Sequence, residues 1–507
     1  MNYRLVKKMI SIIALFLFVQ NIVAQKQTFK DVLSAGSKES GPIIKDNVVV
    51  GYYSFYQFGK KDKKKSYYKL NIYDENLAQL SSKNFSSLGY LSIIEAAYNG
   101  DLIMIKFFDG ANQKFLFKTF DQNAEQVSSS EPSAKNLDIV STQRFATQRS
   151  EEGEGQSLTP IAGEGFAHFI TKSRGGKFSR SYNEINFIPN KTESKGWTWT
   201  TSKDSEFFEW GNILGYGNKT LLCLINKRRK LASKDIEDFI LGIDINTGKT
   251  IFEHSLEDDQ YVASVSDVIV EPNGNFLLFG FYFEKTAKTL TANSLGLFSF
   301  EIDNTGKVLK RTYKSWVKDI SNLLKMDKKG EIEDAGYVFF HKFVKTADNK
   351  IFGIGEQFQP KNSGLSTNIH IKNIHIFEFD NNFDLKSTKS FDKLPSKVSF
   401  PSIMSSSRFL GNYAKNANGF DYSFTQKSKD NSKFSIGYIN YEKAKEGKEY
   451  YLGIINYNEG KLASEKIKFD KKADWLHVYP GKPGYIMISE YFEKEQRLEF
   501  RMEKINF

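Results

Sequence analysis

Cysteine, proline and arginine are all scarce in this chain of 507 residues, and each shortage excludes a class of protein. Cys223 is the sole cysteine, which excludes a disulfide-stabilised scaffold and a cysteine-rich zinc module. Only 10 prolines occur, which excludes a collagen-like chain. Apolar residues make up 40% of the chain and charged residues 26%, so we expect a folded globular protein rather than a disordered one.

Arginine makes up only 11 of the 71 basic residues, so lysine carries most of the net charge of +11. Arginine is the side chain that makes bidentate contacts with phosphates and base edges. A lysine-rich excess therefore predicts a solvated surface and no nucleic-acid partner. The basic runs 60–65 and 227–230 each lie between apolar stretches, and we interpret both as charged loop tips.

Long apolar runs are absent except near the start of the chain, where residues 1–24 have the organisation of an export signal. Basic residues precede the apolar run Met9–Val19, and Ala24 offers a small residue at the cleavage edge. The run is shorter than the ~20 residues that a membrane anchor needs. We expect cleavage before Gln25. The mature chain would then lie in the periplasm, on the cell surface or in the medium, with no membrane span.

Aromatic residues are abundant, at 15% of the chain, and they alternate with polar residues in short runs. This period of two is typical of β-strands. The clearest runs are Leu102–Phe108, Leu221–Ile225, Phe276–Phe283 and Tyr485–Phe492. The sequence therefore predicts an all-β protein.

A tight-turn motif recurs after the strands, in which an aromatic residue or isoleucine precedes Asp, with Asn or Gly close behind. Asp and Asn side chains bond to the backbone just ahead, and Asn and Gly accept positive φ. The clearest copies begin at Asp74, Asp121, Asp244, Asp303 and Asp380, with weaker copies at Asn190 and Asn456. A second turn signal comes earlier in several units, at Asn99–Gly100, Asn273–Gly274, Asp348–Asn349 and Asn418–Gly419.

The motif repeats about every 64 residues between Asp74 and Asn456, which leaves room for four strands in each unit. Four antiparallel strands repeated radially form a β-propeller. We predict a single propeller domain over residues 25–507, with seven or eight irregular blades. A strand around 27–33 would complete the last blade, so that both ends of the chain close the ring. The alternative is two β-sandwiches in tandem.

Two segments interrupt the strand pattern. Residues 126–158 are polar and rich in Ser, Glu and Gly, which predicts a long surface loop with a strand or two inside. Residues 315–327 place Trp316, Ile320 and Leu324 on one face of a helix, with Ser315 as N-cap. We predict one amphipathic helix there, inserted between blades and packed on the rim.

No catalytic motif, cofactor motif or metal-ligand set is present in the sequence. His370 and His375 are five residues apart and would face opposite sides of one strand. Residues 380–384 begin like a calcium loop, but Leu385 stands where that loop requires Gly. We interpret Cys223 as a buried, unreactive residue. The sequence thus predicts no metal and no cofactor.

Polar residues that precede the second turn signal would lie where the inner strands meet a central funnel. They are Glu95, Glu209, Asp267, His341 and Arg408. Such a group would bind a polar ligand or support acid–base chemistry. The alternative is that these side chains only line a water-filled channel.

The export signal, the composition rich in Lys, Asn and Phe, and the irregular units resemble those of secreted bacterial propeller-like proteins of unknown function. The resemblance implies no catalytic residues. We expect a monomeric, exported, non-enzymatic protein that binds a protein or a glycan at the cell envelope or outside the cell. The alternative is a hydrolase or lyase that degrades a polysaccharide or peptide with carboxylates at the funnel.

Overall fold

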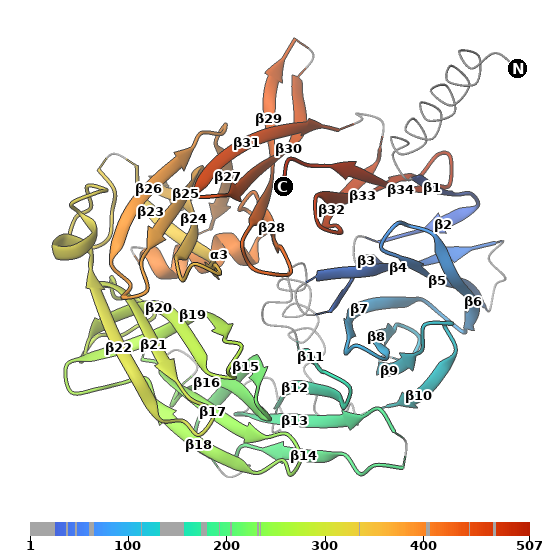
Figure 1. Ribbon diagram of the computed structural model, residues 1–507, viewed down its shortest axis with the longest axis horizontal. Coiled ribbons are helices and arrows are strands. Elements are labelled where there is room, and N and C mark those ends of the chain that lie inside the picture. Colours follow the sequence, from blue (N-terminus) through green and yellow to red (C-terminus); the bar gives the residue numbers. More distant parts are fainter. Residues whose placement is uncertain are drawn as a thin grey trace, which may run out of the picture.

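The computed structural model shows eight antiparallel sheets that follow one another around a ring in chain order (Figure 1). The predicted export signal and residues 132–156 of the predicted loop lie outside the described residues. The structure describes residues 26–36, 39–45, 48–59, 65–112, 114–131, 157–173, 180–191, 193–202, 205–230, 233, 235–333, 335–401, 406–445, 447–469 and 473–507.

Each sheet is one blade with four main strands, and blade 1 begins with β3. The innermost strands are β3 (Ser40–Lys45), β7 (Leu91–Tyr98), β11 (Leu158–Ile161), β15 (Phe208–Gly217), β19 (Tyr261–Val270), β23 (Tyr337–Lys345), β28 (Tyr422–Lys427) and β32 (Trp475–Pro480). The second strands are β4 (Val48–Phe58), β8 (Ile103–Asp109), β12 (Gly165–Ser173), β16 (Thr220–Arg228), β20 (Phe276–Glu284), β24 (Ile351–Ser363), β29 (Phe434–Ala444) and β33 (Tyr485–Phe492).

The outer half of each blade is built in the same way. The third strands are β5 (Ser66–Asp74), β9 (Lys114–Phe120), β13 (Ser181–Pro189), β17 (Glu237–Asp244), β21 (Gly296–Ile302), β25 (Ser366–Phe379), β30 (Gly447–Asn458) and β34 (Arg497–Lys504). The outermost strands are β6 (Gln79–Ser87), β10 (Gln126–Ser130), β14 (Trp197–Thr200), β18 (Thr250–Ser255), β22 (Val308–Ser315), β26 (Leu385–Phe391), β31 (Lys461–Lys468) and β1 (Lys26–Phe29). Two short strands, β2 (Val32–Ser34) and β27 (Ser396–Phe400), extend blades 1 and 6.

The ring is closed by both ends of the described chain, as the sequence predicts. β1 pairs with β34, with Gln27 opposite Phe500, and so supplies the outermost strand of blade 8. In Figure 1 the blue β1 lies beside the red β34. The fold is therefore an eight-bladed β-propeller, and the alternative of two tandem sandwiches is wrong.

The Asp turns join the third strand of a blade to its outermost strand. Asp74 Oδ1 accepts hydrogen bonds from the backbone N–H groups of Asn76 and Ala78, both at 2.8 Å. The residue three positions after Asp74 is Leu77, which has a φ of 61°. Its side chain is almost fully buried. Burial of the side chain thus offsets the cost of the left-handed backbone that the turn requires.

Two helices interrupt the strands in the described part of the chain. The predicted helix 315–327 is present but shorter, as the π-helix η1 (Trp316–Ile320), with Ser315 as its N-cap. Trp316 and Ile320 are buried as expected. Beyond Ile320 the chain continues in turns, where the Leu323 N–H donates to the Ile320 carbonyl at 3.1 Å, and a further turn follows in which Asp327 Oδ1 accepts hydrogen bonds from the N–H groups of Lys329 and Glu331.

The other helix, α3 (Ser407–Asn416), was not predicted from the sequence. The predicted turn Asn418–Gly419 follows this helix rather than an inner strand, and Asn418 has a φ of 50°. The corresponding turn of blade 7 lies instead at 428–433, between β28 and β29. In the predicted loop 126–158, the first residues form β10 and the last begins β11.

The order of the strands separates the connections onto two faces of the ring. Tight turns join first to second strands, as at 99–102, and third to fourth strands, as at 75–78, so all of them lie on one face, which we call the turn face. The longer connections lie on the opposite face, which we call the connection face. They include 285–295, the segment 316–336 with η1, and the segment that holds α3.

The core is divided into layers between neighbouring blades. Phe279 of blade 5 stacks on Phe343 of blade 6, with ring centroids 4.4 Å apart. Phe352 of blade 6 meets Tyr457 of blade 7 at 4.6 Å. Because aromatic rings fill these layers, the centre of the ring does not have to be packed.

Candidate binding site in the central channel

A cavity of about 1350 Å³ lies at the centre of the ring, and all eight innermost strands contribute to its lining. It extends from Asn99 and Gly100 on the turn face to Ser294 and Lys329 on the connection face. The propeller therefore has a central channel large enough for a ligand of several sugar or amino-acid units.

Five of the innermost strands carry a β-bulge, and the extra residue of each bulge lines the channel. The pairing with the second strand skips one residue in blades 2, 4, 5, 6 and 7. The skipped residues are Ile94, Leu214, Ser266, His341 and Ser423. A bulge bends the strand and redirects its side chains, so the bulges decide which residues face the channel.

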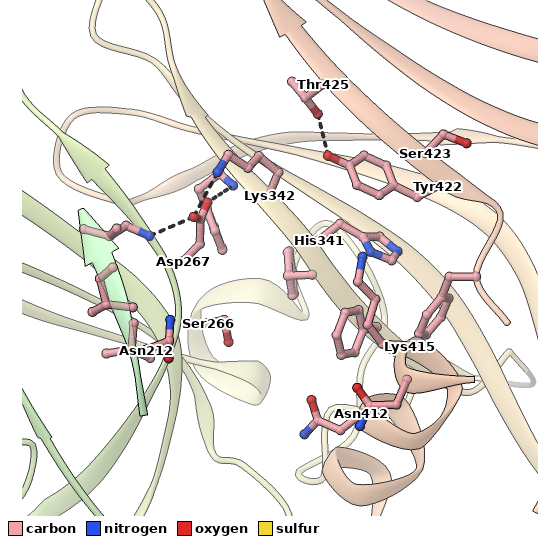
Figure 2. A pocket seen from close by; sticks show the side chains of 18 of the residues that line it. Asn212, Ser266, Asp267, His341, Lys342, Asn412, Lys415, Tyr422, Ser423 and Thr425 are labelled. Atoms are coloured by element: carbon pink, nitrogen blue, oxygen red, sulfur yellow. Dashed lines mark hydrogen bonds and ion pairs between the residues drawn. The ribbon is translucent and has the colours of Figure 1, made fainter. Parts of the chain in front are cut away.

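Glu95 and Asp267 follow such bulges and link their blade to the next one. Asp267 Oδ2 accepts a hydrogen bond from the Phe343 N–H at 2.6 Å, and the Lys342 ammonium donates to Oδ1 at 3.2 Å (Figure 2). Glu95 likewise accepts from the Leu158 N–H of blade 3 at 3.0 Å. Both carboxylates thus hold neighbouring inner strands together.

Glu95 also belongs to a buried polar network between blades 2 and 3. Ser157 Oγ donates to Glu95 Oε2 at 2.5 Å and accepts from Lys106 Nζ at 3.0 Å. Lys106 Nζ lies 3.1 Å from His168 Nε2. Burial lowers the pKa of Lys106 to about 8 and holds the pKa of His168 well below its usual range. Lys106, His168 and Glu95 are all buried, so this interface is shielded from water.

Arg408 reaches the channel from α3 rather than from an inner strand, so the predicted element is wrong although the residue lines the cavity. Its guanidinium donates to the Thr289 carbonyl at 2.9 Å and to Ser264 Oγ. It also lies 3.9 Å from Asp238 Oδ2. Arg408 therefore ties the helix to blades 4 and 5, across one mouth of the channel.

His341 lines the channel at the edge of a buried ionic network between blades 6 and 7. Its Nε2 lies 3.2 Å from Glu356 Oε2, and Lys393 Nζ lies 2.9 Å from Glu356 Oε1. Lys393 also pairs with Asp421 at 2.5 Å. Burial alone would raise the pKa of Glu356, but Lys393 and His341 lower it to about 2. The Glu356 carboxylate is therefore ionised, and both of its oxygens have a partner, Lys393 and His341.

One face of α3 is polar and lies along the channel, and the opposite face is apolar. Asn412 and Lys415 line the cavity together with Arg408, whereas Leu410 and Ala414 are buried against blade 6. Figure 2 shows Lys415 rising from the helix toward His341 and Tyr422. The Lys415 ammonium lies 5.6 Å from the centre of the Tyr422 ring. The helix thus presents a cation and amides to the connection-face mouth.

Basic groups outnumber acidic groups in the lining of the cavity. Seven basic residues line it, namely Lys45, Lys329, Lys342, Arg408, Lys415, Lys427 and Lys448, against four acidic residues, Glu95, Asp238, Asp267 and Asp421. Each of these four carboxylates accepts a bond from another protein group. Five of the lysines make no ion pair within the described part of the chain: Lys45, Lys329, Lys415, Lys427 and Lys448.

Four of the five predicted site residues line the channel, namely Glu95, Asp267, His341 and Arg408. Glu209 does not line the cavity, and it is buried at the start of β15, where Ser205 Oγ donates to its Oε1 at 2.9 Å. The lysines of the lining were not predicted from the sequence. The general excess of lysine does not place them in the channel, because no local pattern distinguishes a channel lysine from a surface lysine.

The structure adds two findings on metals and membranes. Among the described residues, no group of three or more His, Cys, Asp or Glu side chains is placed to hold a metal ion. No helix in the same residues has the length and apolar character needed to cross a bilayer. Cys223 is buried in β16, and burial raises the pKa of its thiol.

The fold and the cavity together define an eight-bladed β-propeller with a predominantly basic central channel. The chain belongs to DUF6770, a family of unknown function, whose model matches residues 5–506. No curated protein matches the sequence at a significant level.

Several solved structures are similar at low identity. Prolyl oligopeptidase B from Galerina marginata is 8% identical, with a TM-score of 0.44 over 90% of this chain and 55% of that one. The acylaminoacyl peptidase of Pyrococcus horikoshii is 10% identical, with a TM-score of 0.37 over 90% of this chain and 57% of that one. This chain therefore spans little more than half the length of either peptidase. An ulvan lyase of polysaccharide lyase family PL25 is 8% identical, with a TM-score of 0.38 over 94% and 96%. Nothing about the function of this chain follows from these similarities.

Proposed function

We propose that this protein is an exported, non-enzymatic binding protein that holds an acidic glycan in its central channel. The observation that carries the proposal is the charge of the lining, where five lysines line one cavity and form no ion pair with any carboxylate among the residues that the structure describes. Cations that gather in a concave, partly desolvated site attract anions from solution and hold them.

The state of the carboxylates favours binding over catalysis. A glycosidase needs two carboxyl groups that act on the substrate, one as an acid and one as a base or nucleophile. Asp238, Asp267 and Asp421 are each bonded to an amide, an N–H group or a lysine of the protein. Glu95 is bonded to Ser157 and Leu158. Glu95 and Asp267 join neighbouring blades, Asp421 pairs with the buried Lys393, and Asp238 lies beside Arg408, so each carboxylate already has a structural partner.

The neutral part of the lining favours a glycan over a peptide. Trp210 and Tyr216 line one side of the channel, and Tyr441 and Tyr450 line another. Tyr450 is half exposed. Aromatic faces stack on sugar rings, and amides such as that of Asn412 match sugar hydroxyl groups. An acidic glycan offers all three features that this lining recognises, namely anions, hydroxyl groups and flat apolar ring faces.

The test is a calorimetric titration of the exported form, from Gln25 onward, with matched oligosaccharides. The set contains oligogalacturonate, a sulfated oligosaccharide and a neutral oligosaccharide of equal length. We expect binding of the acidic members only, with an affinity that falls as salt is raised from 50 to 300 mM, because ions screen the attraction. Equal binding of the neutral oligosaccharide, or binding of none, would refute the proposal. Shortened products after incubation would show an enzyme instead.

A further inference from the structure

Lys427 is the last residue of β28 and lines the channel near the turn face. Lys342 of β23 in blade 6 is near enough to Lys427 to repel it, and both Lys342 and Lys345 of β23 have a carboxylate partner from β19 or the turn that follows β19. Lys342 pairs with Asp267 at 3.2 Å, and Lys345 pairs with Glu271 at 2.9 Å. Two ion pairs therefore join blades 5 and 6, and Lys427 adds a third cation from blade 7.

Lys427 has no such partner, since no ion pair joins it to any carboxylate in the part of the chain that the structure describes. The residue is partly buried. Burial, and then the nearby Lys342 ammonium, lower the pKa of Lys427 to about 8. Asp267 and Glu271 act against this shift but are each engaged by another lysine. The site thus carries one uncompensated positive charge.

We propose that Lys427 and Lys342 form the subsite that binds the acid group of the ligand, a carboxylate or a sulfate ester. The proposal rests on the proposed function and specifies which part of the channel recognises the charge. A partly desolvated cation without a counter-ion is unfavourable. An oxyanion between the two ammonium groups would accept charge-assisted hydrogen bonds from both and neutralise the excess.

The first experiment compares three variants by the calorimetric titration with oligogalacturonate and with the sulfated oligosaccharide. Lys427→Gln is expected to lower the affinity at least about tenfold, and Lys427→Arg to retain most of it, because arginine keeps the charge. Lys443→Gln is the control, because it removes an exposed lysine of the neighbouring strand β29 that does not line the cavity, and it should leave the affinity unchanged. Unchanged affinity in Lys427→Gln would overturn the subsite. The two oligosaccharides distinguish a carboxylate site from a sulfate site.

The second experiment does not depend on a glycan. The full exported chain is acetylated briefly with and without inorganic sulfate, and the modification of each lysine is followed by mass spectrometry. Sulfate should slow the acetylation of Lys427 and leave that of Lys443, which is exposed and does not line the cavity, unaffected. If the wild-type protein binds no oligosaccharide but sulfate still shields Lys427, the proposed function is wrong and the subsite stands. If oligosaccharides bind but Lys427 is neither shielded nor needed, the subsite is wrong and the function stands.

Discussion

At the scale of single residues, the ionisation of several charged groups depends on how deeply they are buried. Glu39 precedes the first inner strand, and its Oε2 accepts a hydrogen bond from the Gly36 N–H at 2.5 Å. Burial raises the pKa of Glu39 from 4.5 to about 7. The folded state therefore binds this proton more tightly than the unfolded chain, and the free energy of unfolding falls as the pH rises from about 4.5 to about 7.

Glu39→Gln tests this linkage. The amide keeps the acceptor but cannot ionise, so the variant should match the wild type at pH 4.5 and exceed it at pH 8 by up to about 3 kcal/mol. Urea unfolding at both pH values measures the difference. Glu75→Gln, at an exposed position, is the control and should change neither value. A variant that is equally stable with the wild type at pH 8 would contradict the assigned shift.

The buried network around Glu356 makes a second prediction at this scale. The Lys393 and Glu356 side chains are both fully buried. Lys393→Met should destabilise the fold by about 3–5 kcal/mol, because it removes the cation that Glu356 and Asp421 share inside the protein. The double variant Glu356→Gln with Lys393→Met should recover part of that loss. In the exposed pair of Lys83 and Glu125, Lys83→Met should cost less than about 1 kcal/mol. Denaturant unfolding measures the stability of all three variants. Equal losses of stability in Lys393→Met and Lys83→Met would be inconsistent with this account.

At the scale of elements, the strand β1 packs against blades 8 and 1 through the side chain of Phe29. The Phe29 ring lies 5.5 Å from that of Phe500 and 5.6 Å from that of Tyr56, so it joins the last blade to the first. Phe29→Ala should lower the free energy of unfolding by about 2–3 kcal/mol, toward the low end of the range because Phe29 is only partly buried. Thr28→Ala, at an exposed position of the same strand, should have little effect. Equal stability of both variants would show that the closing strand contributes no packing.

Some elements of the fold can be predicted from their local sequence, and others cannot. The turns around Asp74 and Asp303 could be predicted because an Asp side chain specifies such a turn within five residues. The helix α3 could not be predicted from the same kind of reading. Its apolar face consists of Leu410, Ala414 and Gly411, which is too short a pattern to separate from a strand. The helix exists because that face packs on blade 6, which is a tertiary contact.

At the scale of the whole molecule, the ring was predictable and the channel was not. A turn motif that repeats along the chain requires repeated sheets, and stacked sheets with both ends in one blade close into a ring. The lining depends on bulges such as those at Ser266 and His341, which leave no mark on the strand pattern. Glu95, Asp267 and His341 could nevertheless be predicted because each precedes the turn that ends an inner strand, whereas the channel lysines, Lys427 among them, could not, because no local pattern distinguishes them from surface lysines.

The central claim is that an acidic ligand lies inside the channel rather than on the surface of the ring. Lysine acetylation of the exported chain, with and without oligogalacturonate, measures this most directly. We predict that Lys45, Lys415 and Lys427 lose reactivity in the presence of the ligand. Lys325 and Lys468, whose side chains are 85% and 73% exposed outside the cavity, should react as before. Protection of the two outer lysines without protection of the three channel lysines would contradict the account.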